Sequence, residues 1–143
     1  MNDILIVDDD KHCRDIFSIA VATYGYSATV VADASSAIRC LSADSFRLVI
    51  TDLDMGGKDD GFRVIAAARQ CVSPPRVCLV SGSVSPEDRK RAIDMGVEWI
   101  IEKPHVNFQK VLDAVFGYSL IEIRQRWHPL LWLYLYLITV ISI

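Results

Sequence analysis

Apolar residues in the first 118 positions fall into two alternating patterns. Short runs of mostly branched apolar residues predict buried strands at 4–7, 28–31, 48–51, 76–80 and 99–101. Apolar residues at helical spacing predict helices at 11–24, 34–41, 62–70 and 86–95, and a last one after Asn107. This alternation predicts an α/β fold in which helices cover both faces of a parallel sheet and right-handed crossovers join the strands.

Local signals mark several helix ends. Asp10 is predicted to be the N-cap of the first helix, and Gly25 to be its C-terminal stop. Ser85 begins a capping box with Pro86 at the first helical position, and Asn107 can cap the last helix. The helical spacing of the first helix rests on Ile16, Ile19, Ala20 and Thr23.

Polar side chains follow the predicted strands where each strand ends. Asp8 and Asp9 follow the first strand, Asp52 the third, Ser81 the fourth and Lys103 the fifth. The carboxyl ends of parallel strands share one edge of a sheet, where ligands bind in such folds. Crowded carboxylates repel one another, and a hard cation such as Mg²⁺ relieves the repulsion. A lysine and a serine nearby would suit a phosphoryl group. Taken singly, each residue also suits a helix cap or a turn.

Composition narrows the class of protein. At 143 residues, the chain is long enough for one domain with an extension. The net charge of −3 gives no reason to expect nucleic-acid binding by this chain. The four cysteines have no CxxC pair or zinc-ligand spacing, which is typical of reduced thiols. A strand begins almost at the N-terminus and leaves no room for a signal peptide, so we expect a cytoplasmic protein.

Residues 1–118 resemble the receiver domain of bacterial two-component response regulators. The matching stretches are ILIVDDD at 4–10, LVITDLDM at 48–55, VSG at 80–82 and EKP at 102–104. The resemblance implies a flavodoxin-like, doubly wound sheet of five parallel strands in the order 2-1-3-4-5. It also implies a phosphoacceptor signalling domain, not an enzyme with a separate substrate, that is phosphorylated by a sensor histidine kinase or a histidine phosphotransfer protein.

The resemblance assigns a role to each acidic residue. Asp52 would be the nucleophile that takes the phosphoryl group from a phosphohistidine. Asp9 and Asp52 would ligate Mg²⁺, and Asp8 would help through a water molecule. The backbone carbonyl of Asp54 would be a further ligand.

The same resemblance assigns the residues after the last two strands. Ser81 would bond a phosphoryl oxygen once Asp52 is modified, and Lys103 would pair with another. The Lys103–Pro104 peptide bond is cis in the family. Catalysis would then consist of attack by a carboxylate, with positioning and charge neutralisation providing the acceleration.

Two regions depart from the family pattern. Gly56 stands where the family usually has proline, and the loop that ends at Gly61 is one residue longer than usual. These changes affect the loop geometry beside the nucleophile. Ile100 stands where the family usually has an aromatic residue that moves inward on activation. Trp99, one position earlier, is either a partner-binding surface or simple packing.

Two other functions compete with the phosphoacceptor. One is a receiver-like interaction module that no longer cycles phosphate, which the altered loop and Ile100 favour. The other is a small-molecule phosphatase, because Asp54 lies two positions after Asp52. Against the phosphatase, no cap domain is visible in the sequence. In a receiver, the Asp54 carboxylate would alter the lifetime of the phosphorylated state.

Residues 119–143 form an apolar extension without a recognised output domain. From Leu130 to Ile143 only Thr139 and Ser142 are polar. As a helix this segment would be ~21 Å long, which is short of the ~30 Å core of a bilayer. It would pack on a partner, contact a membrane or begin a truncated region. We favour packing against a second copy of the chain, which predicts a homodimer.

Overall fold

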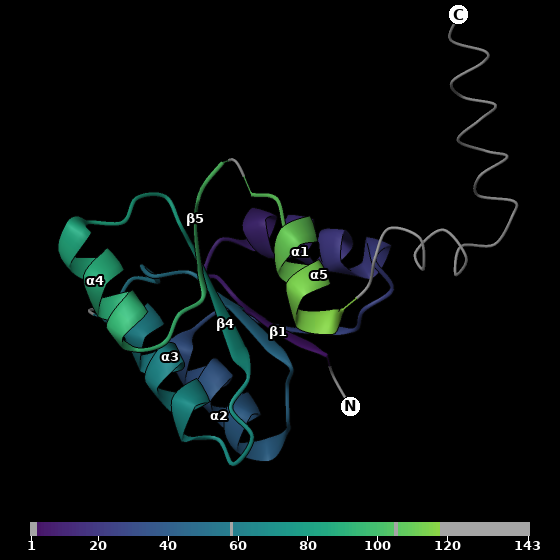
Figure 1. Ribbon diagram of the computed structural model, residues 1–143, viewed down its shortest axis with the longest axis horizontal. Coiled ribbons are helices and arrows are strands. Elements are labelled where there is room, and N and C mark those ends of the chain that lie inside the picture. Colours follow the sequence, from purple (N-terminus) through teal and green to yellow (C-terminus); the bar gives the residue numbers. More distant parts are fainter. Residues whose placement is uncertain (1–2, 58, 105, 118–143) are drawn as a thin grey trace, which may run out of the picture.

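The computed structural model describes residues 3–57, 59–104 and 106–117. Within them, strands and helices alternate from β1 to α5 (Figure 1). The strands are β1 (Ile4–Val7), β2 (Ala28–Val31), β3 (Leu48–Thr51), β4 (Arg76–Ser81) and β5 (Trp99–Glu102). The helices are α1 (Lys11–Thr23), α2 (Ala34–Ala43), α3 (Asp60–Gln70), α4 (Pro86–Asp94) and α5 (Gln109–Phe116).

The five strands form one parallel sheet in the order β2-β1-β3-β4-β5. This order confirms the doubly wound fold that the resemblance implied. In register, Val7 pairs with Thr51 and Ser81 pairs with Glu102. The residues that follow β1 and β3 are therefore neighbours, as are those that follow β4 and β5.

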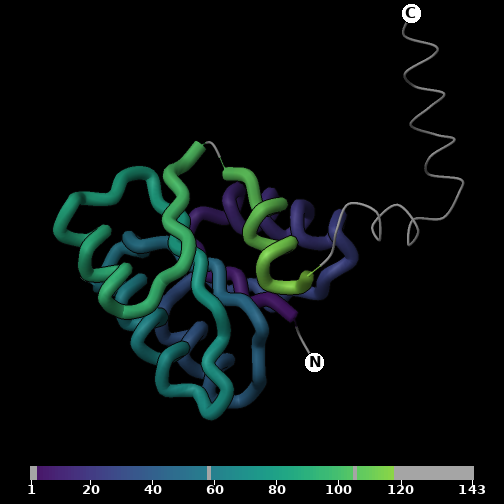
Figure 2. The backbone as a smooth tube through the Cα atoms, in the orientation of Figure 1, coloured from purple at the N-terminus to yellow at the C-terminus, as the bar shows by residue number. Residues whose placement is uncertain are grey.

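The core has two halves, one on each face of the sheet. Helices α1 and α5 cover one face, and α2, α3 and α4 cover the other (Figure 1). The backbone trace shows α1 and α5 side by side, although they lie at opposite ends of the described chain (Figure 2). Phe17 of α1 meets Phe108, just before α5, edge to face with ring centroids 5.0 Å apart.

The continuous apolar runs follow from burial on both faces. In β1, Ile4 and Ile6 pack towards α1 and α5, whereas Leu5 and Val7 pack towards α2 and α3. The same alternation recurs in β3 and β4. Every residue of β1 and β3 is buried, as expected for central strands of a parallel sheet.

Helix caps largely follow the sequence. The Asp10 side chain accepts a hydrogen bond from His12 N at 2.7 Å, and Ser85 Oγ accepts one from Asp88 N at 3.0 Å. Asn107 Oδ1 accepts from Gln109 N at 2.9 Å, one residue before the position of a standard N-cap for α5. Gly25 adopts a φ of +81° just after α1, which confirms its role as a stop.

Element ends differ from the sequence prediction by one or two residues. Helix α3 begins at Asp60, two residues earlier than predicted, and α2 runs two residues longer, to Ala43. Strands β4 and β5 each gain one residue, at Ser81 and Glu102. An apolar pattern does not reveal these ends, because backbone hydrogen bonding continues past the last apolar side chain of the element.

Two of the apolar residues that predicted α1 lie outside its buried stripe, whereas Ala20 packs against the core. Ile16 and Ile19 are 48% and 68% exposed, and the residues buried in the helix are Phe17 and Val21. Phe17 and Val21 lie four positions apart and therefore share one face of the helix. The two isoleucines lie beside that face and leave apolar surface on the outside of the domain.

Trp99 and Ile100 occupy opposite faces of β5. Trp99 is half-buried against the α1 and α5 half of the core, and the Arg76 guanidinium stacks 4.5 Å from the centre of its ring. Ile100 packs against the other half. These contacts favour the packing interpretation of Trp99.

The extension at 119–143 lies outside the described residues. The division at residue 118 and the tail-mediated dimer therefore stay predictions. In the part of the chain that the structure describes, no helix has the length and apolar character needed to cross a membrane.

Candidate functional site

The predicted site residues lie at the carboxyl edge of the sheet. Asp8 follows β1, Asp52 follows β3, Ser81 ends β4 and Lys103 follows β5. Backbone hydrogen bonds extend the ladder into this edge, because Asp52 N donates to Val7 O at 2.9 Å and Lys103 N donates to Ser81 O at 2.8 Å. The sheet itself therefore fixes the backbone beneath all four side chains.

One ammonium group joins two carboxylates at the centre of the site. Lys103 Nζ lies 2.7 Å from Asp8 Oδ2 and 2.8 Å from Asp52 Oδ2. Both carboxylates are buried, and the lysine side chain is 20% exposed. The Lys103–Pro104 peptide bond is cis, as the resemblance implied.

The remaining carboxylate oxygens accept backbone hydrogen bonds. Asp8 Oδ1 accepts from Asp10 N at 2.9 Å. Asp52 Oδ1 accepts from Leu53 N at 2.6 Å and from Asp54 N at 3.3 Å. The Asp52 side chain is thus held by the lysine at one oxygen and by the following backbone at the other.

Burial and hydrogen bonding have opposite effects on the pKa of two charged groups of the site, Asp8 and Lys103. Burial raises the pKa of Asp8, although the hydrogen bonds from Lys103 and the Asp10 backbone oppose this. Burial alone would lower the pKa of Lys103, but its hydrogen bonds with Asp52 and Asp8 outweigh burial, so the pKa is raised. Lys103 is therefore a stable cation at neutral pH.

The acidic residues form a group with the geometry of a cation site. Among the described residues, one carboxylate oxygen each from Asp8, Asp9 and Asp52 lies within 4.8 Å of the other two. Asp9 is exposed and the other two are buried. An all-oxygen donor set of this kind fits Mg²⁺. The Asp54 side chain is exposed and is not a member of this group, and only its backbone carbonyl was predicted to be a ligand.

Ser81 lies at the predicted edge of the sheet, although it is the last residue of β4 and not the residue that follows it. It is 2% exposed and ends β4, next to the strand that leads to Lys103. Its side chain belongs to the same edge of the sheet as the acidic group.

The loop after Asp52 has its own conformation. Gly56 adopts a φ of +85°, which proline cannot reach because its ring holds φ near −65°. Asp59 is also left-handed, at φ +61°, and it pairs with Arg91 of α4 at 2.6 Å. A proline at position 56 could therefore not take the backbone conformation that Gly56 has here.

Gly61 brings α3 against the backbone of the nucleophile candidate. A Cβ at this position would lie 2.5 Å from Asp52 O, and Gly61 N donates to Leu53 O at 3.0 Å. A larger residue would push α3 away from the site. In the sequence, Gly61 is only the end of a glycine-rich loop, and nothing local to it signals a contact with Asp52.

Arg14 is a second residue that the sequence analysis missed. Its Nη1 donates to Asp8 O and to Asp9 O, each at 2.8 Å. Arg14 lies in the first turn of α1, four positions after the cap Asp10. The only sequence signal would have been this spacing, because it directs a long side chain back over the loop.

A largely apolar groove of about 300 Å³ adjoins the site. Its lining comes from α1 and from the segment between β5 and α5, and includes Ile16, Phe17, Lys103, Pro104 and Phe108. Lys103 therefore faces both the acidic group and this groove. Ile16 lines this groove and is 48% exposed, and Ile19, which is also exposed, lies farther along α1 outside the lining.

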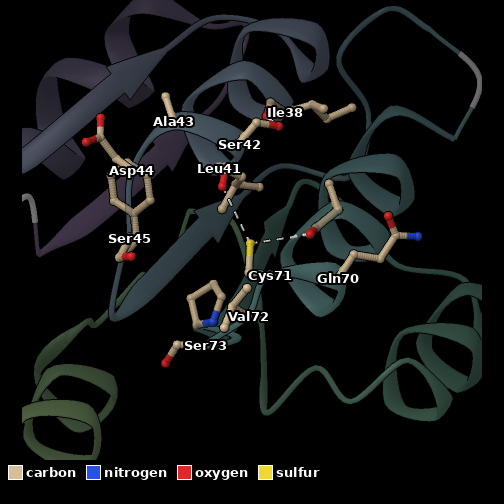
Figure 3. Close-up of a pocket in the computed structure, with 13 residues that line it drawn as sticks. Ile38, Leu41, Ser42, Ala43, Asp44, Ser45, Gln70, Cys71, Val72 and Ser73 are labelled. Carbon is tan, nitrogen blue, oxygen red and sulfur yellow. Dashed lines mark hydrogen bonds between the residues drawn. The ribbon is translucent and has the colours of Figure 1, made fainter.

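A different hollow, of about 530 Å³, lies at the opposite edge of the sheet, between the ends of α2 and α3 (Figure 3). The Cys71 thiol lies on its wall, 3.5 Å from Ala67 O and 3.7 Å from Leu41 O. Asp44 and Cys71 are the ionisable residues of its lining. This hollow is separate from the acidic group.

Comparison with known proteins agrees with this geometry. Residues 4–116 match the family model described as the response regulator receiver domain. An NtrX-like response regulator of Rickettsia bellii is 30% identical over 111 residues, which cover 77% of this chain and 23% of that protein. The chain thus spans about a quarter of the length of this curated relative.

Solved structures share the fold. A CheY-like receiver domain protein of Methanospirillum hungatei JF-1 has a TM-score of 0.72 at 24% identity, with 89% of this chain and 99% of that chain covered. A response regulator of Burkholderia pseudomallei, solved with a phosphorylated aspartic acid, a calcium ion and citrate, has a TM-score of 0.71 at 22% identity. The match covers 80% of this chain and 66% of that one.

Proposed function

The chain belongs to the response regulator receiver family, and from this premise we propose that Asp52 accepts a phosphoryl group from a phosphohistidine. The donor would be a sensor histidine kinase or a histidine phosphotransfer protein. The position of the Asp52 carboxylate carries the proposal: it lies at the end of β3, with Lys103 Nζ at one oxygen and two backbone N–H groups at the other.

The transfer is a displacement at phosphorus. A carboxylate oxygen of Asp52 forms a bond to phosphorus while the bond from phosphorus to the imidazole nitrogen breaks. The imidazole nitrogen keeps the electron pair of the broken bond. The chain contributes the oriented nucleophile and the fixed positive charge of Lys103, and these preorganised groups lower the barrier. The chain is its own phosphoacceptor, and we propose no separate substrate.

We propose that Mg²⁺ is held by Asp8, Asp9, Asp52 and the backbone carbonyl of Asp54. The donor set is all oxygen, and the group carries more negative charge than Lys103 alone neutralises. The bound cation would offset negative charge on the incoming phosphoryl group. In the Burkholderia protein, a phosphorylated aspartic acid and a divalent calcium ion occur in one structure, which supports this assignment.

Lys103 and Ser81 would bind the phosphoryl oxygens after transfer. Lys103 already touches Asp52, so its ammonium needs little movement to reach an oxygen attached to that carboxylate. Ser81 supplies a hydroxyl from the neighbouring strand. The presence of both, together with the three aspartates, favours phosphate cycling over an interaction module without it.

The α1 side of the site is our proposed docking surface for the donor protein. Ile16 and Ile19 are exposed there, and the groove ends at Lys103 and Pro104. A phosphohistidine must approach the edge that Asp52 occupies, and a partner seated on α1 would bring it there. Because the proposed donors act in the cytoplasm, we place the domain there too.

The decisive experiment is incubation with acetyl phosphate and Mg²⁺, followed by intact-mass analysis. We expect a mass gain of one phosphoryl group that requires the metal. No gain under conditions that label a known receiver would contradict the proposed function.

A further inference from the structure

Arg14 lies behind the acidic loop and holds two of its carbonyl groups. Its Nη1 donates to Asp8 O and Asp9 O at 2.8 Å each. We propose that Arg14 is a positioning residue, which sets the direction of the Asp8 and Asp9 carboxylates toward a divalent cation without touching that cation. The inference rests on the proposed Mg²⁺ site.

The peptide group between Asp9 and Asp10 is held at both ends. Its carbonyl oxygen, Asp9 O, accepts from Arg14, and its N–H, Asp10 N, donates to Asp8 Oδ1 at 2.9 Å. A peptide group fixed at both ends cannot rotate, and this limits the backbone torsions on either side. The exposed Asp9 carboxylate therefore takes its direction from a backbone that Arg14 anchors.

Arg14 can act as an anchor because α1 is itself fixed. Arg14 N donates to Asp10 O at 3.0 Å, and the Asp10 side chain caps the helix. Farther along α1, Phe17 and Val21 are buried against the sheet. The chain of contacts therefore runs from the core through α1 to the loop, which is the support that a preorganised metal site requires.

The positive charge of Arg14 and its positioning role have opposite effects on Mg²⁺ affinity. A guanidinium near a divalent cation repels it, so removal of the charge alone would strengthen Mg²⁺ binding. Loss of positioning would weaken Mg²⁺ binding. The two effects are opposite, and the direction of the measured change separates them.

The test is a calorimetric Mg²⁺ titration of the full chain and of Arg14→Met. We expect Arg14→Met to bind Mg²⁺ about tenfold more weakly, which is the usual loss when a supporting residue behind a metal ligand is removed. Arg14→Lys keeps the charge with a shorter reach and should lie between the two. The matched control is Arg39→Met, which removes an exposed arginine of α2 whose hydrogen bond goes to Ser36.

Several outcomes overturn the inference. One is Mg²⁺ binding by Arg14→Met that is unchanged or tighter. Another is a lower melting temperature of Arg14→Met with unchanged Mg²⁺ affinity at temperatures where the variant is folded. If Arg14→Met does not fold, Arg14→Lys decides, and affinity equal to that of the wild type overturns the inference. Absence of Mg²⁺ binding by the wild type is distinct, because it contradicts the proposed function as well.

Discussion

Lys103 and Asp52 are 51 positions apart in the chain and are joined by an ion pair of 2.8 Å between Nζ and Oδ2. The same ammonium also binds Asp8, so one cation serves two buried carboxylates. Transfer of a phosphoryl group to Asp52 adds negative charge at a place that already has an excess. We therefore expect phosphoryl transfer to Asp52 to depend on a further cation, such as the proposed Mg²⁺, that offsets this charge.

Asp52→Asn should abolish the mass gain with acetyl phosphate, because an amide oxygen is a poor nucleophile toward phosphorus. Asp54→Asn is the matched control, since it removes a nearby carboxylate that is exposed. We expect it to keep the gain of one phosphoryl group. An undiminished gain in Asp52→Asn would show that another residue is modified.

Asp9→Ala should weaken Mg²⁺ binding by at least about tenfold, because it removes an oxygen ligand from the acidic group. Calorimetry measures the affinity directly, and tryptophan fluorescence, to which Trp99 contributes, gives a second readout. Asp3→Ala, at the opposite end of β1, serves as the control for the loss of one negative charge. Equal affinities for Asp9→Ala and the wild type would place the cation elsewhere.

Asp8→Asn should raise the melting temperature at neutral pH without Mg²⁺. Burial raises the pKa of Asp8, so the folded chain keeps a proton at a pH where the unfolded chain has lost it. The free energy of unfolding therefore falls as the pH rises from the ordinary aspartate pKa to the raised pKa of Asp8. Above the raised pKa this loss of stability stays constant. Lys103 remains paired with Asp52 in the variant.

Thermal melts in EDTA across this pH range measure the effect. The gap between Asp8→Asn and the wild type should close as the pH falls and the wild-type carboxyl is protonated. A wild type that is more stable than Asp8→Asn at neutral pH would show that the ion pair with Lys103 outweighs burial. Asp54→Asn, at an exposed position, should show little change.

The sequence predicted the sheet because the central residues of β1, β3 and β4 are buried on both faces and form continuous apolar runs. It located Asp8, Asp52, Ser81 and Lys103 because the ends of parallel strands share an edge. The sequence pattern did not predict the contacts of Gly61 and Arg14. Each contact depends on the path of a loop against a helix. Neither the close approach of Gly61 to Asp52 O nor the hydrogen bonds of Arg14 to Asp8 O and Asp9 O follow from a periodic pattern of residues.

The exposed face of α1 shows the limit of periodicity in another way. Ile16 and Phe17 are adjacent apolar residues, and both fit a helical stripe with other apolar positions of α1. Only packing decides which stripe is buried, and here Phe17 meets Phe108 while Ile16 stays half-exposed. The apolar surface left over is what suggests a docking face.

Ile19→Glu should slow phosphoryl transfer from a histidine kinase while leaving labelling by acetyl phosphate unchanged. Ile19 is 68% exposed, so the change should cost little stability, but a charge on α1 would weaken an apolar contact with the donor. Ile93→Glu, at a 58% exposed position of α4, is the matched control. Equal slowing by both variants, or slowing with acetyl phosphate too, would argue against docking on α1.

Truncation after Tyr118 should keep the fold and the phosphorylation but abolish self-association. The last described helix is complete at Phe116, and Arg76 Nη1 and Arg47 Nη2 already bind its carbonyls Ala114 O and Val115 O, at 2.6 Å and 3.3 Å. These two contacts, made within the described residues, hold the last turn of α5 against the segments that begin β3 and β4, so we expect the truncated chain to fold.

The extension itself should drive a dimer or a larger oligomer in the full chain. Between Leu130 and Ile143 only two residues are polar, and burial of apolar surface is worth ~25 cal/mol per Å². The groove beside α1, at about 300 Å³, is too small for so many large side chains, so a second copy of the chain is the better cover. Light scattering on the two chain lengths, with and without phosphorylation, measures the difference. A full chain that is monodisperse and monomeric without detergent would contradict the proposed dimer, because the extension would then be covered by its own domain.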